Sequence, residues 1–337
     1  MKAAVLKGVQ DIGVEELPEP KVEKDGVIVK VHSCGICGSD LHIYKRGGRE
    51  GNTPGHEFGG EIVEVGSNIT GVKVGDRVAV MSGRGCGECY WCKQGDWIKC
   101  SKMALLGIGF PGAFAEYVSV PNFSLGLYAA KLPESISYQQ AATAEPLAVA
   151  LHAVHQMNPQ PGDTAVVIGL GIIGLCIVQI LKSIGVSRII ASGRRAKRLQ
   201  LAKEGGADVV VNAAVDDIVP VVAEVTNGKG ADIVFEVAGT PDTFQQSLQI
   251  VHRGGKIDIV GLYQEPITWN ASFIVSNDIW LVGCGLRFDL PGAVELMENG
   301  SVDTRPLVTH QFPLDDVKEA FDTQANVTEA IKVLVNP

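Results

Sequence analysis

A chain of 337 residues, of which 46% are hydrophobic, is long enough for about two domains with sizeable cores. Its net charge of −9 argues against general nucleic-acid binding, which requires a basic face. No apolar run reaches the roughly 18 residues that a membrane span needs, the start lacks the apolar stretch of a signal peptide, and the sparse cysteines fit a reducing cytoplasm.

Short β-type runs separated by glycines fill roughly the first 145 residues. The clearest of these runs are Val27–Val31, Gly59–Val65, Arg77–Val80 and Ala115–Val120. Each is apolar or alternating for a few residues and then turns, which is typical of half-buried strands. The pattern therefore predicts an antiparallel, barrel-like domain.

Two loops of this predicted domain carry residues that can bind a catalytic metal. Cys34 and Cys37 form a C-x-x-C pair, but the strand and helix pattern of a thioredoxin-like redox motif is missing around them. Further along, a turn is followed by His56 and Glu57. Because a catalytic zinc needs three protein ligands and one open position, Cys37, His56 and a carboxylate form a candidate site. The alternative is that the His-Glu pair belongs to an ordinary polar loop.

Four further cysteines lie close together in a segment with little apolar periodicity: Cys86, Cys89, Cys92 and Cys100. Four thiolates at this spacing can close a tetrahedron around one zinc ion, so the loop is expected to be folded by a metal. Disulfides are the alternative, but 8 cysteines in the whole chain are too few for a disulfide scaffold. We therefore predict a structural zinc site.

Around Pro146 the pattern changes to strands that alternate with helices. The predicted strands are Thr164–Ile168, Arg188–Ser192, Val209–Asn212, Ile233–Val237 and Lys256–Val260, and the predicted helices among them are Gly174–Gly185 and Lys197–Glu204. Such βαβ units indicate a parallel sheet. After Gly283 the pattern loosens, and two more helices are expected over Leu290–Asn299 and Leu314–Thr323.

A glycine-rich turn follows the first strand of this second region. It consists of Gly169, Gly171 and Gly174, with Ile172 and Ile173 between the last two, and it opens a helix. Glycines there allow a tight turn and a close approach of the backbone to a pyrophosphate, and the helix N-terminus attracts the phosphate charge. The motif in this context predicts a dinucleotide site.

The end of the second strand indicates which dinucleotide is bound. An acid that would bind the ribose hydroxyls of NAD is absent there, and the chain has Ser192, Gly193 and Arg194 instead. Without the acid a 2′-phosphate is not repelled, and Arg194 can pair with it bidentately. The prediction is therefore NADP(H). The alternative is that Arg194 and its neighbours Arg195, Lys197 and Arg198 form only a solvated first helical turn.

An ordered series of motifs runs from Met1 almost to the C-terminus. It consists of GICGSDLH around Cys37, GHE at His56, the four-cysteine loop, Glu145-Pro146-Leu147 and the glycine-rich turn. The series resembles the zinc-containing medium-chain dehydrogenase/reductase family, most of all its polyol (sorbitol and ketose reductase) branch, with threonine dehydrogenase nearby. The resemblance implies an α/β fold with a GroES-like β-rich catalytic domain (1–147), a Rossmann doubly wound domain (148–285) and a return to the catalytic domain (286–337).

The resemblance also assigns roles to individual residues. The catalytic zinc would be bound by Cys37 and His56, with Glu57 and Glu145 as carboxylates that occupy or exchange at the remaining positions. Ser39 and His42 would relay the hydroxyl proton to solvent, which a hydroxyl and an imidazole that titrates near neutrality can do. Arg287 would face the substrate, although Phe288 replaces a frequent tyrosine beside it. Gly261 and Leu262, after the fifth strand of the second region, would contact the coenzyme.

The leading hypothesis is a reversible zinc-dependent dehydrogenase with two zinc ions per chain, acting on a secondary alcohol or polyol and its ketone with NADP(H). A second hypothesis is an NAD-dependent amino-alcohol dehydrogenase similar to threonine dehydrogenase. A third is a catalytically idle dinucleotide-binding protein. The family resemblance further implies a cytoplasmic homo-oligomer, a dimer or tetramer, built through the nucleotide domain, with the β-rich runs near Ile257 to Trp280 extending a sheet across the interface.

Overall fold

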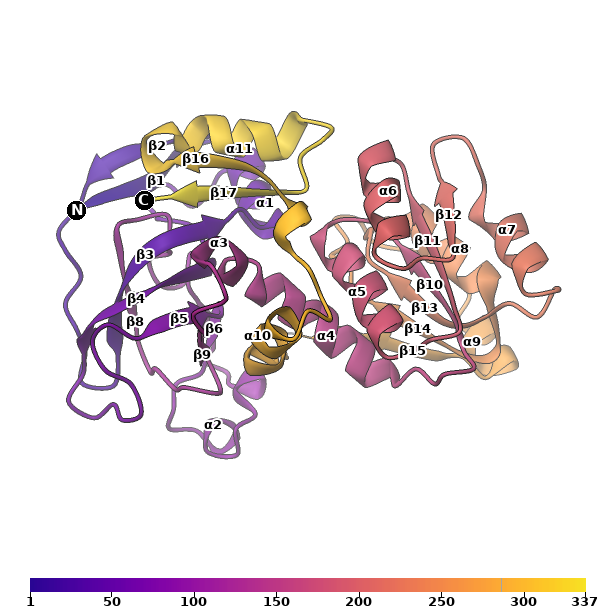
Figure 1. Ribbon diagram of the computed structural model, residues 1–337, viewed down its shortest axis with the longest axis horizontal. Coiled ribbons are helices and arrows are strands. Elements are labelled where there is room, and N and C mark those ends of the chain that lie inside the picture. The colour runs from indigo at the N-terminus through magenta and orange to yellow at the C-terminus, as the bar shows by residue number, and fades with distance from the viewer. Residues whose placement is uncertain (286) are drawn as a thin grey trace. The chain divides into compact units, whose positions relative to one another are not determined.

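The computed structural model describes residues 1–285 and 287–337 and divides the chain into two compact units. The first unit comprises Met1–Ala148, Phe288–Gly300 and Thr304–Pro337, and the second comprises Val149–Arg287 and Ser301–Asp303. Both ends of the chain therefore belong to the first unit (Figure 1). Each unit has its own sheet and its own hydrophobic core, and each is described by itself.

The first unit is built on a seven-stranded sheet. Its strands follow the order β16 (Val308–Pro313), β17 (Lys332–Asn336), β3 (Val27–Gly35), β4 (Glu57–Val65), β5 (Arg77–Val80) and β9 (Ala129–Lys131), while β8 (Tyr117–Val120) also pairs with β3. All pairs are antiparallel except β16 with β17. Two smaller pairs accompany the sheet: β1 (Lys2–Gly8) with β2 (Asp11–Glu16), and β6 (Gly83–Arg84) with β7 (Ala104–Leu105).

Short helices fill the connections of this unit. They are α1 (Gly38–Arg46), α2 (Tyr90–Lys93), α3 (Tyr138–Ala141), α10 (Leu290–Glu298) and α11 (Val317–Asn326), with 3₁₀ turns at Trp97–Lys99, Arg305–Leu307 and Leu314–Asp316. The core lies between the sheet and α11, where Phe321 packs edge-on against Phe114 and also contacts Tyr44. The strand from the end of the chain, β17, thereby lies directly beside β3 (Figure 1).

The second unit contains a six-stranded parallel sheet. Its order is β12 (Val209–Asn212), β11 (Arg188–Gly193), β10 (Thr164–Ile168), β13 (Ala231–Glu236), β14 (Val251–Ile259) and β15 (Trp280–Gly283). In chain order this is 3-2-1-4-5-6, the order of a doubly wound dinucleotide-binding fold. The predicted α/β fold class, with a β-rich domain and a Rossmann domain, is confirmed.

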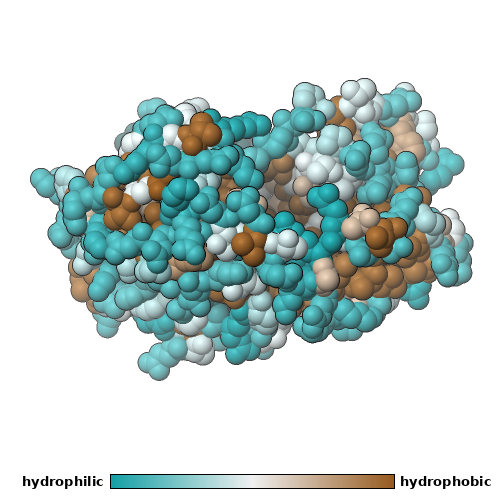
Figure 2. Space-filling view, turned by 90° about the horizontal axis from the view of Figure 1, so that it is seen from above, coloured by the Kyte–Doolittle hydropathy of each residue, from teal (hydrophilic) through white to brown (hydrophobic). Residues whose placement is uncertain are grey.

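Helices cover both faces of this sheet. They are the C-terminal part of α4 (Ala144–Met157), then α5 (Ile172–Ser183), α6 (Ala196–Glu204), α7 (Ile218–Val225), α8 (Pro241–Ile250) and α9 (Ser272–Asn277). The helix α5 contacts α6, whereas α7 contacts α8 (Figure 1). Hydrophobic residues gather over part of the surface of this unit, drawn in brown in Figure 2. No helix in the described part of the chain is long and apolar enough to cross a bilayer.

The predicted element limits were correct where local signals were strong. The strands β5, β10 and β12 have the predicted limits, because apolar runs end there at turn residues. Three helices begin at other residues than predicted, and for α6 the difference is a single residue, Ala196 rather than Lys197. The helix α5 begins at Ile172 rather than Gly174, because Gly171 is its extended N-cap. The predicted helix Leu314–Thr323 begins as a 3₁₀ turn after Pro313, and the α-helix α11 starts only at Val317.

Candidate functional site

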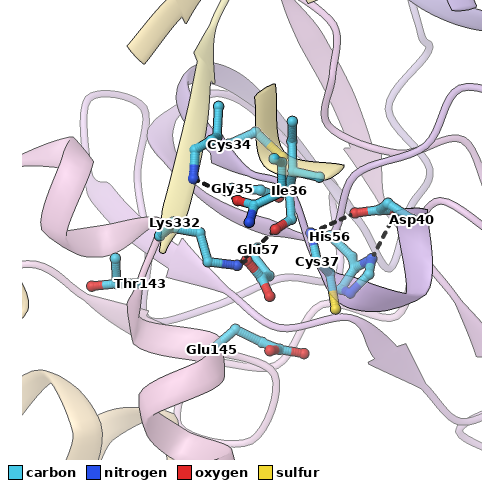
Figure 3. Close-up of polar contacts among 12 residues, drawn as sticks. Cys34, Gly35, Ile36, Cys37, Asp40, His56, Glu57, Thr143, Glu145 and Lys332 are labelled. Carbon is cyan, nitrogen blue, oxygen red and sulfur yellow. Dashed lines mark hydrogen bonds and ion pairs between the residues drawn. The ribbon is translucent and has the colours of Figure 1, made fainter. Parts of the chain in front are cut away.

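Strand pairing brings the predicted catalytic ligands together. Gly35, at the end of β3, pairs with Glu57, at the start of β4, so the residues that flank these positions lie close to one another. Cys37 is the N-cap of α1, two residues after the end of β3, and His56 directly precedes β4. The ligand atoms of Cys37, His56 and Glu57 all lie within 4.8 Å of one another (Figure 3). A thiol, an imidazole and a carboxylate form a donor set that fits zinc.

Asp40 contacts two segments that carry these candidate ligands. Its carboxylate accepts hydrogen bonds from the backbone N–H of Cys37 at 3.0 Å and of Gly55 at 3.4 Å. Its Oδ1 also lies 3.6 Å from Nδ1 of His56 (Figure 3). A carboxylate on one ring nitrogen leaves the other nitrogen for a metal, which is the usual support of a metal-binding histidine. Burial alone opposes a charged imidazole, but Asp40 and Cys37 raise the pKa of His56 well above its ordinary value.

Glu145 approaches the same group from another helix. It is the second residue of α4, it is 6% exposed, and its Oε1 accepts a hydrogen bond from the Ser82 hydroxyl at 3.1 Å. In Figure 3 its carboxylate extends toward the Cys37 sulfur. Burial raises the pKa of Glu145 to about 7, although the neighbouring His56 opposes this shift.

The four-cysteine loop forms a second group of candidate ligands. The sulfurs of Cys86, Cys89, Cys92 and Cys100 lie within 4.8 Å of one another. No disulfide joins them, and the sulfurs of Cys86 and Cys92 are 4.0 Å apart. Backbone N–H groups within the loop point at the sulfurs, for example that of Cys89 at Cys86 Sγ, at 3.4 Å. Such donors favour thiolates, so this loop also fits a tetrahedral zinc ion.

The second unit has a groove of about 510 Å³ at the carboxyl ends of its strands. Five of the predicted coenzyme residues line it: Gly169, Gly171, Ser192, Gly193 and Arg194. An added Cβ at Gly171 would face open space, whereas one at Gly174 would lie 1.9 Å from the carbonyl oxygen of Gly169. The turn is therefore open toward the groove and closed toward the helix, which fits the backbone approach of a dinucleotide.

Comparison with known proteins agrees with this geometry. Residues 23–132 match the family model described as the alcohol dehydrogenase GroES-like domain, and residues 173–299 match the zinc-binding dehydrogenase model. Sorbitol dehydrogenase of Bacillus subtilis is 39% identical over 100% of this chain and 97% of its own length. The chain belongs to the zinc-binding alcohol dehydrogenase family. The predicted resemblance is confirmed, and the protein is an oxidoreductase.

Solved structures of other family members align with the whole length of this chain. The structure of 2R,3R-butanediol dehydrogenase from Bacillus subtilis is 37% identical, has a TM-score of 0.88, and is matched over 100% of this chain and 99% of that one. A zinc-binding dehydrogenase from Sinorhizobium meliloti 1021 bound to NADP is 31% identical, with a TM-score of 0.91 and the same coverage. Zinc and a nicotinamide coenzyme are thus the cofactors that belong to this family.

Lys332 is a buried cation beside the candidate metal ligands of this dehydrogenase. It lies on β17, is 3% exposed, and donates hydrogen bonds to Glu57 Oε2 at 2.5 Å and to the carbonyl oxygen of Ile36 at 2.8 Å. Although burial opposes the charge of Lys332, Glu57 and Cys37 raise its pKa. Gly35 makes room for the pair, because a Cβ there would lie 2.6 Å from Glu57 Oε2.

The predicted proton relay lies on α1. Ser39 and His42 are three residues apart and therefore share a face of this helix. Cys37, and not Ser39, is the N-cap of this helix. Burial, with the charges of Arg46 and Lys45, lowers the pKa of His42, so the imidazole is neutral at pH 7 and can accept a proton.

The remaining predicted residues lie in the second unit. Ile172 and Ile173 form the first turn of α5. Gly261 and Leu262 follow β14, and Gly261 packs against Gly239 next to the residues that line the groove. Arg287 is exposed, and its charge contributes, after burial, to lowering the pKa of His152. Its role toward the substrate stays a prediction.

Three supporting residues are not revealed by the sequence pattern: Asp40, Ser82 and Lys332. Asp40 had a weak signal, a carboxylate three residues after a candidate ligand. The Lys332 signal is a lone lysine within an apolar run of the sequence, which suggests a buried partner but does not identify it. That partner, Glu57, is 275 positions away in the chain.

Proposed function

We propose that this protein is a zinc-dependent dehydrogenase that transfers a hydride between NADP(H) and a secondary alcohol or polyol, or its ketone. The observation that carries the proposal is the compact group of Cys37, His56 and Glu57, with His56 and Glu57 buried. Relatives named sorbitol dehydrogenase and 2R,3R-butanediol dehydrogenase support the substrate class. When bound, zinc supplies a Lewis acid for the substrate oxygen, and the coenzyme supplies the hydride acceptor.

Two carboxylates are available to complete the metal site. Lys332 holds one oxygen of Glu57, whereas Glu145 accepts a hydrogen bond from the neutral Ser82 hydroxyl. A carboxylate that shares its charge with a lysine is a weaker metal ligand than one that does not. We therefore assign Glu145 as the ligand of the substrate-free enzyme, with Glu57 able to exchange with it.

Removal of the alcohol proton is assigned to Ser39 and His42. The Ser39 hydroxyl, two residues after Cys37, would accept the proton and pass its own to the neutral imidazole of His42. His42 is partly exposed and would release the proton to solvent. Arg287 would bind a substrate hydroxyl, as the family resemblance implies.

The coenzyme preference is proposed from three arginines. Arg194, Arg195 and Arg198 line the groove, whereas Lys197 of the same segment does not. A cluster of guanidinium groups at the end of β11 suits a 2′-phosphate, which a carboxylate at that place would repel. The NAD-linked amino-alcohol alternative has less support for the same reason. The relative with bound NADP agrees with this preference.

We also propose that the enzyme assembles as a homo-oligomer through the outer edge of β15. This strand pairs with β14 on one side, and no strand among the described residues pairs with its other side. Trp280, on this edge, is 65% exposed, and Val275 on the neighbouring α9 is 84% exposed. An unpaired strand edge flanked by apolar residues favours a second copy of the same chain.

A zinc assay combined with turnover tests the proposed function. The purified protein should contain two zinc ions per chain and should oxidise members of a panel with sorbitol, 2,3-butanediol and simple secondary alcohols, faster with NADP+ than with NAD+. Cys37→Ser should remove one zinc and the activity, and Cys89→Ser should remove the other zinc. Cys176→Ser, at a buried thiol of α5, is the control and should keep both.

Other outcomes would decide against parts of this proposal. A single zinc ion, lost in Cys89→Ser but kept in Cys37→Ser, together with no turnover on the panel, would favour a catalytically idle dinucleotide-binding protein. A preference for NAD+ would contradict the role of the arginines and leave the chemistry intact.

A further inference from the structure

Glu236 is a buried carboxylate at the carboxyl end of β13, where the groove begins. Its side chain is 0% exposed. Oε1 accepts hydrogen bonds from the backbone N–H of Ala238 at 2.9 Å and of Gly239 at 3.0 Å. These two residues belong to the loop Val237–Thr240, in which Val237, Ala238 and Thr240 line the groove. The carboxylate therefore fixes the backbone of a loop that faces the coenzyme site.

The same carboxylate reaches the next loop of the sheet. Oε2 accepts a hydrogen bond from the Tyr263 hydroxyl, which follows β14. Burial, together with this bond to a carboxylate, raises the pKa of Tyr263 far above its ordinary value, so the hydroxyl stays protonated and donates. The backbone carbonyl oxygen of Glu236 also accepts the N–H groups of Val260 and Gly261, at 2.8 and 2.9 Å. Glu236 thus joins the loops after β13 and β14.

At two glycines the backbones of these loops pack too closely to leave room for a side chain. An added Cβ at Gly169, the first glycine of the coenzyme turn, would lie 2.7 Å from the backbone nitrogen of Ala238. An added Cβ at Gly261 would lie 2.4 Å from the backbone nitrogen of Gly239. The backbones of three successive loops, after β10, β13 and β14, are therefore in direct contact, and the loop that Glu236 holds is the middle one.

We propose that Glu236, assisted by Tyr263, is a positioning residue that holds the loop Val237–Thr240 and the glycine-rich turn in the conformation that binds the dinucleotide. The inference rests on the proposed coenzyme site. It assigns to Glu236 a role in coenzyme affinity and none in hydride transfer itself. The three loops contact one another through backbone atoms and not through the arginines. Loss of Glu236 should therefore weaken the binding of both nicotinamide coenzymes.

Two variants test this role. Glu236→Gln removes the negative charge and replaces Oε2 by an amide group that cannot accept a hydrogen bond from the Tyr263 hydroxyl. Tyr263→Phe removes only the hydroxyl. Since hydrogen bonds to a buried charge are strong, we expect Glu236→Gln to weaken binding of both NADPH and NADH about 10-fold and Tyr263→Phe about 3-fold, measured by titration calorimetry. Turnover at saturating coenzyme should stay within about 2-fold of the parent value.

A second readout needs no coenzyme. In Glu236→Gln the backbone amides of Val237–Thr240 should exchange hydrogen about 10-fold faster than in the parent, because the side chain that accepts the Ala238 and Gly239 N–H groups has lost its negative charge and its bond to Tyr263. Asp258→Asn is the matched control, since Asp258 is another fully buried acid, on the adjacent strand β14, and its partner is Gln156 of α4. This control should change neither the exchange of the loop nor the coenzyme affinity.

The outcomes separate this inference from the proposed function. A parent protein that binds NADPH and NADH while both variants bind them equally well would overturn the positioning role alone. A parent that binds neither coenzyme would overturn the proposed function and this inference with it. If Glu236→Gln does not fold, the affinity of Tyr263→Phe for NADPH and NADH is the test of the proposal. An affinity equal to that of the parent would then contradict the positioning role.

Discussion

Basic residues that lie close together in the sequence differ in whether they line the coenzyme groove. Arg194 lines the groove and is proposed to pair with a 2′-phosphate, whereas Lys197, three residues later, lies outside the lining. Arg194→Ala should raise the KM for NADP+ about 10- to 100-fold, the usual effect of losing a charge-assisted, bidentate phosphate contact. The KM for NAD+, which has no 2′-phosphate, should change little, and initial-rate kinetics with both coenzymes measures the two values.

Lys197→Ala is the matched control for this prediction, because it removes a cation three residues from Arg194, in the first turn of α6, that does not line the groove. It should change neither value. An equal rise of both KM values in Arg194→Ala would show that Arg194 acts through the shape of the groove and does not read the phosphate.

Lys332 and Glu57 form a buried ion pair, and removing one partner alone is expected to lower the stability of the protein. Lys332→Met leaves the Glu57 carboxylate buried at 2% exposure without its cation, which typically costs about 3–5 kcal/mol of stability. A zinc ion beside Cys37 and His56 would supply positive charge to the same carboxylate. We therefore expect the loss of thermal stability to be larger in chelator-treated protein than in zinc-loaded protein.

Melting temperatures with and without chelator measure this difference. Lys2→Met provides the control, because Lys2 pairs with Asp315 at the surface, where an ion pair contributes little. An equal loss in both states of Lys332→Met would mean that zinc and Lys332 do not act on the same carboxylate.

At the scale of the elements, the strand β14 and the helix α4 of the second unit are joined by one buried acid. Asp258 is 0% exposed and accepts two hydrogen bonds of 2.8 Å from the Gln156 amide. Burial raises the pKa of Asp258 from 3.8 to about 7. Between these values the folded protein holds a proton that the unfolded chain releases, so the contribution of Asp258 to stability falls as the pH rises from about 4 to about 7.

Asp258→Asn removes this titration. The free energy of unfolding of Asp258→Asn, relative to the parent, should therefore rise with pH across this window, by at most about 1.4 kcal/mol per pH unit, the limit for one proton. Denaturant unfolding at a series of pH values measures it. A difference that stays constant from pH 4 to pH 8 would contradict the prediction.

The elements that the sequence predicts well are those with local signals. The strands β5, β10 and β12 follow from apolar runs, and the glycine-rich turn follows from its place between a strand and a helix. The contacts around the metal group do not follow in this way. Lys332 meets Glu57 only because β17, from the end of the chain, pairs with β3, and no local pattern encodes that pairing. The same holds for Glu236 and Tyr263, which meet through parallel strands.

At the scale of the whole molecule, the sheet of the second unit ends in two edges of different character. The strand β12 forms one edge, and the exposed Val215 follows it. The strand β15 forms the other edge, where Trp269, Ile274, Trp280 and Leu281 line an apolar hollow of about 420 Å³. An exposed strand edge beside an apolar hollow is a ready template for pairing with another strand. The proposed homo-oligomer therefore uses the β15 edge rather than the β12 edge.

Light scattering coupled to size exclusion tests which edge is used. The parent protein should have a mass that is a multiple of its 35.7 kDa chain. Trp280→Glu places a charge on the β15 edge and should shift the mass to that of one chain, because a buried unpaired carboxylate is incompatible with an interface. Val215→Glu places the same charge at a site that is 77% exposed beside the β12 edge and should leave the mass unchanged. A change of mass in Val215→Glu alone would indicate that the interface uses the β12 edge. A monomeric parent would exclude both edges.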